Sequence, residues 1–316
     1  MDEIQVPIYL LAGFLDAGKS SFLTFTIRQD YFDIDEPTLL ILCEEGEIEY
    51  DLEALKKHNT LLEVVYQKED FTPQLLQSYA DKYNPGRVLL EFNGMWPVNE
   101  FHEMQLPTGW GVVQQIAIFD ASTFQMYQTN MKSLISEMVK KSELVIFNRC
   151  RQELPLASFR RGVKVVNQGA EIIFENEKGE MDNIFADNPP YDLSAPVVDI
   201  APEDYGIWYV DTMDHPERYK GKTIRLKAKV LKSRDLPSKF FVPGRMAMTC
   251  CDDDTTFLGY ACKSAFAPKL STGQWVEVTA RMAYENLSVY KGEGFVLYAQ
   301  DVQISDPLEE EMVYFN

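Results

Sequence analysis

A short segment near the start of the sequence has the residue types and the spacing of a phosphate-binding loop. It reads Gly13-Phe14-Leu15-Asp16-Ala17-Gly18-Lys19-Ser20 and fits the pattern G-x-x-x-x-G-K-[ST]. The backbone N–H groups of such a loop wrap a polyphosphate, its lysine reaches the outer phosphates, and its hydroxyl ligates Mg²⁺. We therefore expect Lys19 and Ser20 to hold a nucleoside triphosphate and its magnesium ion. The remaining phosphate contacts are expected from Gly13, Asp16, Ala17, Gly18 and Ser21.

The flanks of this loop supply the elements that must position it. An aliphatic and β-branched stretch from Ile4 to Leu11 leads into the loop, and residues 19–28 continue from it with helical spacing. A helix that begins at the loop directs its unpaired N–H groups and the positive end of its dipole at an anion. The alternative is a glycine-punctuated turn that binds nothing, but the strand, loop and helix together favour a nucleotide site.

Polar residues follow further buried runs, where they would meet a nucleotide on the loop. Glu91 ends an aliphatic run, and a carboxylate there can hold the water shell of a metal or orient an attacking water. Gly94, a little further on, offers an amide to the γ-phosphate. Asp120 closes another run, and Asn148 to Arg151 stand where a loop that reads the base would lie. The spacing thus predicts metal, catalytic and base-reading groups at successive strand ends.

Runs typical of buried strands alternate with runs of helical spacing over the first part of the chain. The strands are expected at residues 8–11, 38–43, 61–66, 87–92, 115–119, 144–147 and 163–166, and the helices at 19–28, 51–57, 73–83 and 121–141. Alternating strands and helices imply a mostly parallel sheet that is covered on both faces. The sequence therefore predicts an α/β fold of the P-loop NTPase class, in which the loop after the first strand binds phosphate.

The order of these segments resembles the CobW-type GTPases, a family of metal-center accessory proteins related to the hydrogenase and urease maturation GTPases. Members of that family typically read GFLGAGKTT, NEFGEVGID, ETTG, VDA and NKxD in this order. The corresponding segments begin at Gly13, Cys43, Glu91, Phe119 and Asn148, and the likeness extends over residues 5–186. The tail from Val166 to Asp182 is also similar to the last stretch of that family's domain.

The resemblance implies roles for several of these side chains. The loop that contains Glu44 and Glu47 would act as a switch, with Glu44 near the magnesium ion and Glu47 near the reaction. Glu91 would take the metal-associated or catalytic position, and Asp120 would help to organise metal and water. The implied nucleotide contacts are Gly94, Asn148, Arg149 and Asn167, and the implied magnesium ligands are Ser20, Glu91 and Glu44.

The chain also departs from the family pattern. The guanine-reading Asn-Lys-x-Asp becomes Asn148-Arg149-Cys150-Arg151, so a cation stands where a carboxylate would accept from guanine. Loss of such a charge-assisted acceptor costs about 1.5–3 kcal/mol, or roughly ten- to a hundredfold in selectivity. The expected nucleotide is therefore GTP or ATP. Residues 64–71 contain no cysteine of the family's Cys-x-Cys-Cys metal motif, and Asp16 replaces a loop glycine.

A proline-rich, aperiodic segment at residues 187–204 is interpreted as a linker between a first domain at residues 1–186 and a second at 205–316. Beyond the linker, residues 223–230 alternate polar and apolar, and residues 274–280 nearly do so. Further strands are expected at residues 240–251, 255–262 and 294–304. About five antiparallel strands indicate a small all-β barrel, most like an OB-fold.

The second domain contains a cysteine motif of its own. Arg245 opens an R-x-x-x-x-C-C-x-x-D run similar to one in the soluble C-terminal domain of the small subunits of bacterial two-component permeases. Cys250 and Cys251, with Cys262 from the next strand, would supply ligands for Zn²⁺ or another transition metal. Without a bulge, however, adjacent strand residues point to opposite faces, so both could not reach one site. The alternative is a set of small buried side chains that ends a strand.

Composition excludes several classes of function. Most of the net charge of −19 resides in residues 1–204, which hold 16 basic and 34 acidic residues. This field repels nucleic acid and anionic membranes over about a Debye length, so we expect no nucleic-acid partner and no membrane insertion. The five cysteines form an odd set without disulfide spacing, and neither a signal pattern nor an apolar run of spanning length is present. A cytoplasmic protein is expected.

Two functions remain open. The first is a Mg²⁺-dependent nucleoside triphosphatase that acts slowly as an accessory or metal-trafficking switch. The second is a degenerate nucleotide fold that serves as a scaffold for a permease or metalloprotein partner, and a homodimer is compatible with either. The intact Lys19-Ser20 pair and Glu91 favour the enzyme, whereas Arg151 and the missing cysteine motif favour the scaffold.

Overall fold

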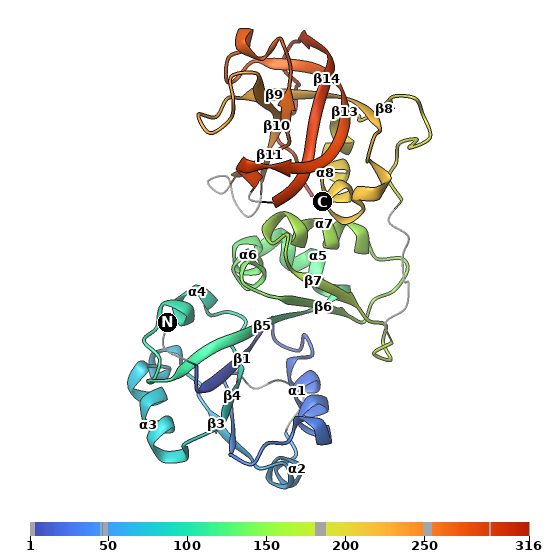
Figure 1. Cartoon of the computed structure of the whole chain (residues 1–316). Coiled ribbons are helices and arrows are strands. Elements are labelled where there is room, and N and C mark those ends of the chain that lie inside the picture. Colours follow the sequence, from blue (N-terminus) through green and yellow to red (C-terminus); the bar gives the residue numbers. More distant parts are fainter. Residues whose placement is uncertain are drawn as a thin grey trace. The chain divides into compact units, whose positions relative to one another are not determined.

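The chain folds as two units that divide between Phe185 and Ala186 (Figure 1). The computed structural model describes residues 4–44, 46, 50–180, 188–248, 255–290 and 292–315. By this division the segment expected as a linker, residues 187–204, belongs to the second unit. Val198 and Asp199 form strand β8, which pairs in parallel with Ile224 and Arg225 of the following strand.

A seven-stranded sheet forms the centre of the first unit. Its strands are parallel throughout and follow the order β3-β2-β4-β1-β5-β6-β7. β2 and β4 are buried at every position, as expected of strands covered on both faces. This confirms the predicted α/β fold of the P-loop NTPase class. The bounds are β1 Val6–Ala12, β2 Thr38–Leu42, β3 Thr60–Val64, β4 Arg87–Glu91, β5 Trp110–Asp120, β6 Leu144–Asn148 and β7 Glu171–Phe174.

Helices cover both faces of this sheet. α1 and α2 pack with Leu23, Ile27 and Leu55 on one face, and the apolar clusters of the other face include residues of α3 to α7. Because all strands are parallel, the loops after β1, β2, β4, β5 and β6 gather at the same edge of the sheet. The bounds are α1 Lys19–Ile27, α2 Leu52–Lys57, α3 Pro73–Tyr83, α4 Val98–Glu103, α5 Ala121–Asn130, α6 Lys132–Lys140 and α7 Leu156–Val166, with 3-10 turns η1 Asp30–Phe32 and η2 Lys68–Asp70.

The last strand of the sheet differs from the sequence-based expectation. Residues 163–166, expected as a strand, form the end of α7, and the strand is instead Glu171–Phe174. Apolar residues of α7 recur with helical spacing and are buried. A short apolar run fits a buried helical turn as well as a strand, so periodicity could not decide between them. The helix expected at residues 121–141 is interrupted at Met131, which separates α5 from α6.

The second unit is built on a closed barrel of five strands, β9, β10, β12, β14 and β13. They pair in that order, and pairing between β13 and β9 closes the ring. β11 extends the sheet beyond β10, and β8 extends it beyond β9. The predicted small β-barrel is confirmed, and its assignment to the OB class stays a prediction. The bounds are β8 Val198–Asp199, β9 Thr223–Leu231, β10 Phe240–Met248, β11 Thr255–Gly259, β12 Ala261–Lys263, β13 Trp275–Leu287 and β14 Gly292–Ile304.

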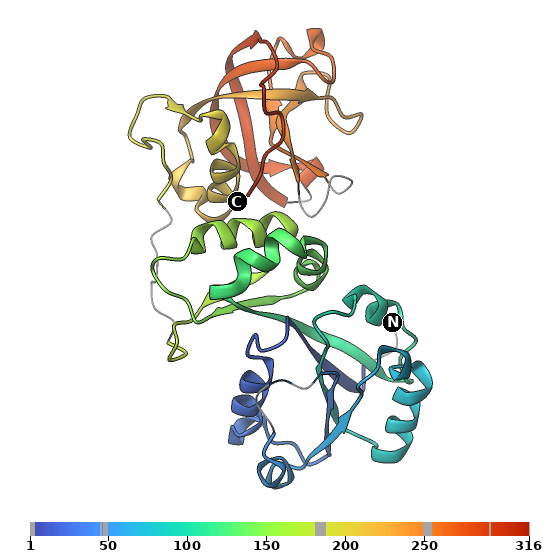
Figure 2. The ribbon, with the colours of Figure 1, turned by 180° about the vertical axis from the view of Figure 1, so that it is seen from behind.

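A helix that the alternating pattern did not predict packs beside the barrel (Figure 2). The buried Tyr205 hydroxyl at its start donates to the Leu258 carbonyl oxygen at 2.9 Å. The buried Arg245 guanidinium donates to the carbonyl oxygens of Pro202 and Glu310, and so ties the C-terminal tail to the segment before the helix. Arg245 therefore has a structural role. The bounds are α8 Tyr205–Asp214, with 3-10 turns η3 Pro202–Asp204, η4 Pro216–Arg218, η5 Ala267–Lys269 and η6 Ser288–Tyr290.

Candidate functional site

The expected phosphate-binding loop turns between β1 and α1 through conformations that favour glycine. Gly13 and Gly18 have φ angles of +150° and +102°. A Cβ at Gly13 would lie 2.3 Å from the Ile118 carbonyl oxygen, and one at Gly18 would lie 2.5 Å from Asn148 Nδ2. Both positions therefore disfavour a side chain. Asp16, with a φ of 57°, adopts the left-handed conformation that aspartate tolerates better than most residues.

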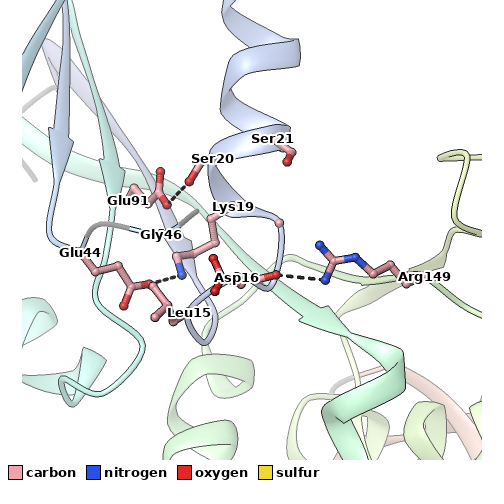
Figure 3. Close-up of a pocket in the computed structure, with 10 residues that line it drawn as sticks. Leu15, Asp16, Lys19, Ser20, Ser21, Glu44, Gly46, Glu91 and Arg149 are labelled. Atoms are coloured by element: carbon pink, nitrogen blue, oxygen red, sulfur yellow. Dashed lines mark hydrogen bonds and ion pairs between the residues drawn. The ribbon is translucent and has the colours of Figure 1, made fainter. Parts of the chain in front are cut away.

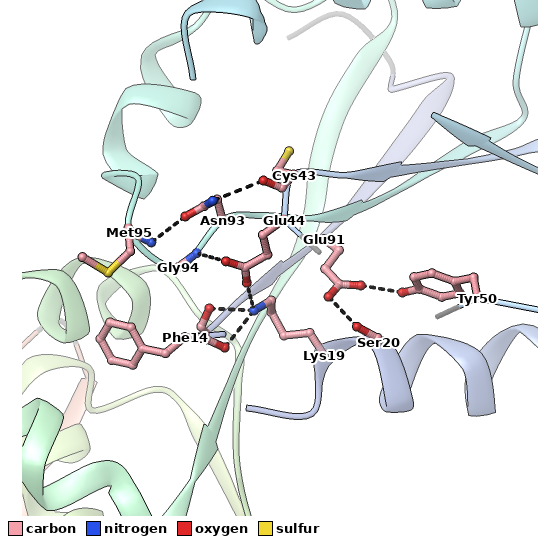
Figure 4. Close-up of polar contacts among 11 residues, drawn as sticks. Phe14, Lys19, Ser20, Cys43, Glu44, Tyr50, Glu91, Asn93, Gly94 and Met95 are labelled. Carbon is pink, nitrogen blue, oxygen red and sulfur yellow. Dashed lines mark hydrogen bonds and ion pairs between the residues drawn. The ribbon is translucent and has the colours of Figure 1, made fainter. Parts of the chain in front are cut away.

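Lys19 begins α1, and its ammonium group lies against the loop (Figure 4). It donates to the carbonyl oxygens of Gly13 and Phe14 at 2.8 and 2.9 Å. Its remaining partner is the Glu44 carboxylate, which follows the end of β2. The side chain of Lys19 is only 2% exposed, so these three acceptors replace water around a buried charge. The loop is thus built around one ammonium group.

The Glu44 carboxylate also reaches the loop after β4. Its Oε2 accepts from the Gly94 amide at 3.3 Å, while Oε1 pairs with Lys19. Gly94 itself packs directly on the phosphate-binding loop. A Cβ there would lie 2.4 Å from the Gly13 carbonyl oxygen and 2.6 Å from Phe14 Cα. The loops after β1, β2 and β4 therefore meet around a single carboxylate, as Figure 4 shows.

Ser20 and Glu91, two of the expected magnesium ligands, lie in contact. Ser20 Oγ donates to Glu91 Oε1 at 2.7 Å, and the Tyr50 hydroxyl donates to Oε2 at 2.5 Å (Figure 4). Burial raises the pKa of Glu91, and the Tyr50 bond and the nearby Lys19 charge only partly offset this effect. Tyr50 was not predicted as a site residue. It lies just before α2, and no sequence pattern there indicates that its hydroxyl contacts Glu91 at the end of β4.

The loop after β6 holds the phosphate-binding loop from its other side. Asn148 Nδ2 donates to the Ala17 carbonyl oxygen at 2.6 Å. Arg149 Nη1 donates to the Asp16 carbonyl oxygen at 3.0 Å, as Figure 3 shows. Arg149 also pairs with the Asp120 carboxylate at 2.5 Å. Burial alone would raise the pKa of Asp120, but bonds from Ser122 and Arg149 outweigh it and lower the pKa. Asp120 thus positions Arg149.

These groups fit a magnesium-bound polyphosphate. Gly18, the N-cap of α1, has no side chain, and no described side chain caps the helix in its place, which leaves the N–H groups of the first turn to an anion. The hydroxyl of Ser20 and the carboxylate of Glu91 supply the oxygen ligands that Mg²⁺ prefers. Asn148 Oδ1 is buried, and no described residue donates a hydrogen bond to it. A buried acceptor in that state costs about 1–3 kcal/mol, so a donor from a ligand is favourable there.

One cleft contains most of the residues expected from the sequence. Figure 3 shows Asp16, Lys19, Ser20, Ser21, Glu44, Glu91 and Arg149 around it, with Leu15 and Gly46, and Gly18 also lines it. Three other predicted residues bond to this set: Gly13, Gly94 and Asp120. Asn148 bonds to Ala17 of the phosphate-binding loop. The cleft therefore assembles groups from five loops at the carboxyl edge of the sheet.

Asn167 does not belong to this cleft. It follows α7 and precedes β7, which places it at the amino edge of the parallel sheet. Its side-chain amide donates to the carbonyl oxygens of Val139 and Ser142 at 3.0 and 2.7 Å. This corrects its assignment as a nucleotide contact, because the phosphate-binding loop lies at the opposite, carboxyl edge of the sheet. Glu47 lies outside the described residues.

The structure places the predicted metal ligands in different surroundings. Glu44 contacts Lys19 and Gly94 rather than the Ser20 and Glu91 pair. Within the described parts of the chain, no three His, Cys, Asp or Glu side chains form a group that could hold a metal ion. Cys250 and Cys251 fall outside those parts. Cys262 is a free, buried thiol in β12, where burial raises its pKa to about 12.

The fold and the cleft define a P-loop nucleotide-binding domain, and comparison with known families agrees. Residues 7–174 match the family model described as CobW/HypB/UreG, nucleotide-binding domain. The match covers more than half of the chain, so the chain belongs to this family. Residues 176–315 match the DUF1980 C-terminal domain. No curated protein matches the chain.

Solved structures of low identity are also similar. The hydrogenase maturation factor HypB from Archaeoglobus fulgidus is 15% identical, with a TM-score of 0.42, over 56% of this chain and 84% of that one. The Zn(II)-bound YjiA GTPase from E. coli is 16% identical, with a TM-score of 0.41, over 82% of this chain and 89% of that one. At these TM-scores the likeness adds nothing to the family assignment, which rests on the family match.

Membrane insertion finds no support in the helices. Across the described residues, none of them combines the length and the apolar character needed to cross a bilayer.

Proposed function

We propose that the chain binds a nucleoside triphosphate with Mg²⁺ and hydrolyses it slowly, as a CobW-type accessory or metal-trafficking switch in the cytoplasm. The observation that carries this proposal is the Lys19 ammonium group, which is 2% exposed inside a glycine-bounded loop and adjoins the Ser20–Glu91 pair. Burial of an ammonium group costs free energy. An anionic ligand that pairs with Lys19 would offset this cost, and membership of a nucleotide-binding family supports a phosphate as that ligand.

Each residue of the cleft has a distinct part in the proposed reaction. The loop amides and Lys19 bind phosphate, while Ser20 and Glu91 are the residues that would hold Mg²⁺. When bound, Mg²⁺ would neutralise charge on the phosphoryl oxygens. Glu91 would also orient the attacking water. Burial raises the pKa of Glu91, and an adjoining cation favours its carboxylate form.

The identity of the base is part of the proposal. Asn148 Oδ1, buried without a described donor, would accept a hydrogen bond from the ligand. Arg149 is fixed by Asp120 and Asp16, and Arg151 replaces the carboxylate that reads guanine in the family. An arginine can stack on either purine or donate to guanine O6, but it cannot accept. GTP and ATP are therefore both proposed ligands, with weak discrimination between them.

A second candidate function is supported by the C-terminal domain. The chain joins a nucleotide-binding domain to a DUF1980 C-terminal domain, which a hydrolase alone does not need. In this alternative the barrel binds a permease or metalloprotein client, the nucleotide-binding domain acts as a scaffold, and the chain can pair as a homodimer. Zn²⁺ bound through Cys250, Cys251 and Cys262 would belong to that function. Nucleotide binding without turnover is the result that would favour it.

Substitution of the buried lysine tests the proposed function. We expect Lys19→Ala to abolish binding of GTP and ATP in the presence of Mg²⁺, measured by equilibrium titration of the purified full-length chain. Lys56→Ala, an exposed lysine of α2, is the matched control and should bind as the parent does. Circular dichroism establishes that both variants are folded. Equal affinities of a folded Lys19→Ala variant and the parent would remove the phosphate-binding role of the loop.

A further inference from the structure

A carboxylate of the chain itself stands among the phosphate-binding groups. Glu44 pairs with Lys19 through Oε1 and accepts from the Gly94 amide through Oε2 at 3.3 Å. Its side chain is 9% exposed and that of Lys19 is 2% exposed, so water screens the pair little. In this state the loop already holds an anion (Figure 4).

The two donors that hold Glu44 are the ones assigned to the outermost phosphate. Lys19 reaches the β- and γ-phosphates in loops of this type, and the Gly94 amide adjoins it across the cleft. The other acceptors of Lys19 are backbone oxygens of the loop. Glu44 is therefore the partner that a phosphate would replace. Glu44 and a phosphate cannot bind these donors together, because the single Gly94 N–H donates to one acceptor and the two anions repel each other.

We propose that Glu44 sets the discrimination of this site between nucleoside triphosphates and diphosphates, by occupying the donors of the γ-phosphate until a triphosphate displaces it. This inference rests on the proposed function and concerns the same cleft. A triphosphate must break both Glu44 contacts and move the carboxylate away. A diphosphate uses the loop amides and shares Lys19 through its β-phosphate, but it leaves the Gly94 amide to Glu44. The contact therefore weakens triphosphate binding selectively.

The same contact makes the segment after β2 responsive to the ligand. Glu44 is two residues beyond Leu42, the last residue of β2. Release of its carboxylate removes the contacts of this segment with Lys19 and with the Gly94 amide, while Asn93 Nδ2 still donates to the Cys43 carbonyl oxygen. Binding of the γ-phosphate is thus coupled to release of the Glu44 side chain.

A role for Glu44 as a magnesium ligand makes the opposite prediction. A metal ligand contributes to binding of the magnesium-bound triphosphate, so its removal would weaken that binding. The geometry separates the two groups. Glu44 lies on Lys19 and Gly94, whereas Ser20 and Glu91 bind each other. The sign of the change in triphosphate affinity decides between the two roles.

The test compares Glu44→Gln with the parent by equilibrium titration of the full-length chain. The probes are the non-hydrolysable imidodiphosphate analogues of GTP and ATP, and GDP and ADP, all with Mg²⁺. Glutamine keeps the shape of the side chain and removes its charge. We expect affinity for at least one triphosphate analogue to rise about tenfold or more, as a lost charge-assisted contact implies, and affinity for the matching diphosphate to change less than about threefold.

Two further variants complete the design. Glu44→Ala should shift the ratio of triphosphate to diphosphate affinity in the same direction and answers the question if Glu44→Gln does not fold. Glu53→Gln, an exposed glutamate of α2, should leave the ratio unchanged. An unchanged or lowered ratio in folded Glu44 variants that bind nucleotide would overturn this inference alone. Failure of the parent and all variants to bind any of the four probes would overturn the proposed function, and this inference with it.

Discussion

Replacement of Gly94 by alanine should disturb the stability of the first unit and its nucleotide binding together. The added Cβ would lie 2.4 Å from the Gly13 carbonyl oxygen and 2.6 Å from Phe14 Cα. Both are backbone atoms, which cannot rotate aside as the end of a side chain can. Relief of the contact needs a displacement of about 1 Å, and overpacking of this kind costs roughly 1–3 kcal/mol.

The same displacement acts on the phosphate-binding groups. The Gly13 and Phe14 carbonyl oxygens are two of the acceptors that hold Lys19, and the Gly94 amide contacts Glu44. We therefore expect Gly94→Ala to lower the affinity for a magnesium-bound triphosphate at least about tenfold, which corresponds to roughly 1.4 kcal/mol.

Urea unfolding followed by circular dichroism measures the first effect, and equilibrium titration measures the second. Gly169→Ala is the matched control, because a Cβ there would meet only Asn167 Oδ1, at an ordinary distance of 3.6 Å. It should change the free energy of unfolding by less than about 0.5 kcal/mol. The unfolding transition of the second unit serves as an internal reference, because neither substitution lies in that unit. Equal unfolding free energies for the two variants would refute the close packing of Gly94 on the loop.

Other predictions address catalysis, base recognition and domain organisation. Glu91→Gln should lower turnover at least about tenfold and weaken nucleotide binding less than that, since an amide orients the attacking water and holds Mg²⁺ less well than a carboxylate does. Glu103→Gln, exposed on α4, should keep the parent rate in a phosphate-release assay, and equal rates for both variants would exclude a catalytic part for Glu91. The parent should bind GTP and ATP within about tenfold of each other, a difference of roughly 1.4 kcal/mol or less. Arg151→Asp should shift that preference towards GTP, and strong GTP selectivity in the parent would show that another group reads the base. Residues 186–316 should fold alone by circular dichroism, whereas a fragment from residue 205 should melt at a lower temperature, because it lacks β8 and the 2.6 Å ion pair between Asp199 and Arg225. An unfolded 186–316 fragment would contradict the division of the chain.

Local sequence patterns predicted the strand, the glycine-bounded loop and the helix around Lys19. The glycines at positions 13 and 18, the lysine and the flanking strand and helix are adjacent in the chain, so spacing alone indicated their arrangement. The strand ends at Glu91, Asp120 and Asn148 could also be placed, because parallel strands bring their carboxyl ends to one edge.

Contacts between distant side chains could not be predicted in this way. The sequence indicated an acidic loop around Glu44, but the pairing of Glu44 with Lys19 depends on how two loops pack. The Tyr50–Glu91 bond has the same origin. The resemblance implied a nucleotide contact at Asn167, but this residue lies between α7 and β7, at the edge of the sheet opposite the phosphate-binding loop.

Calorimetric titration of the unmodified full-length chain with GTP, ATP and GDP, with and without Mg²⁺, is the most direct test of nucleotide binding. The proposed function predicts saturable binding of one nucleotide per chain, with triphosphate affinity that falls when EDTA removes Mg²⁺ from the Ser20–Glu91 pair. Absence of saturable binding for all three nucleotides up to about 1 mM, which corresponds to a binding free energy weaker than roughly −4 kcal/mol, would contradict it.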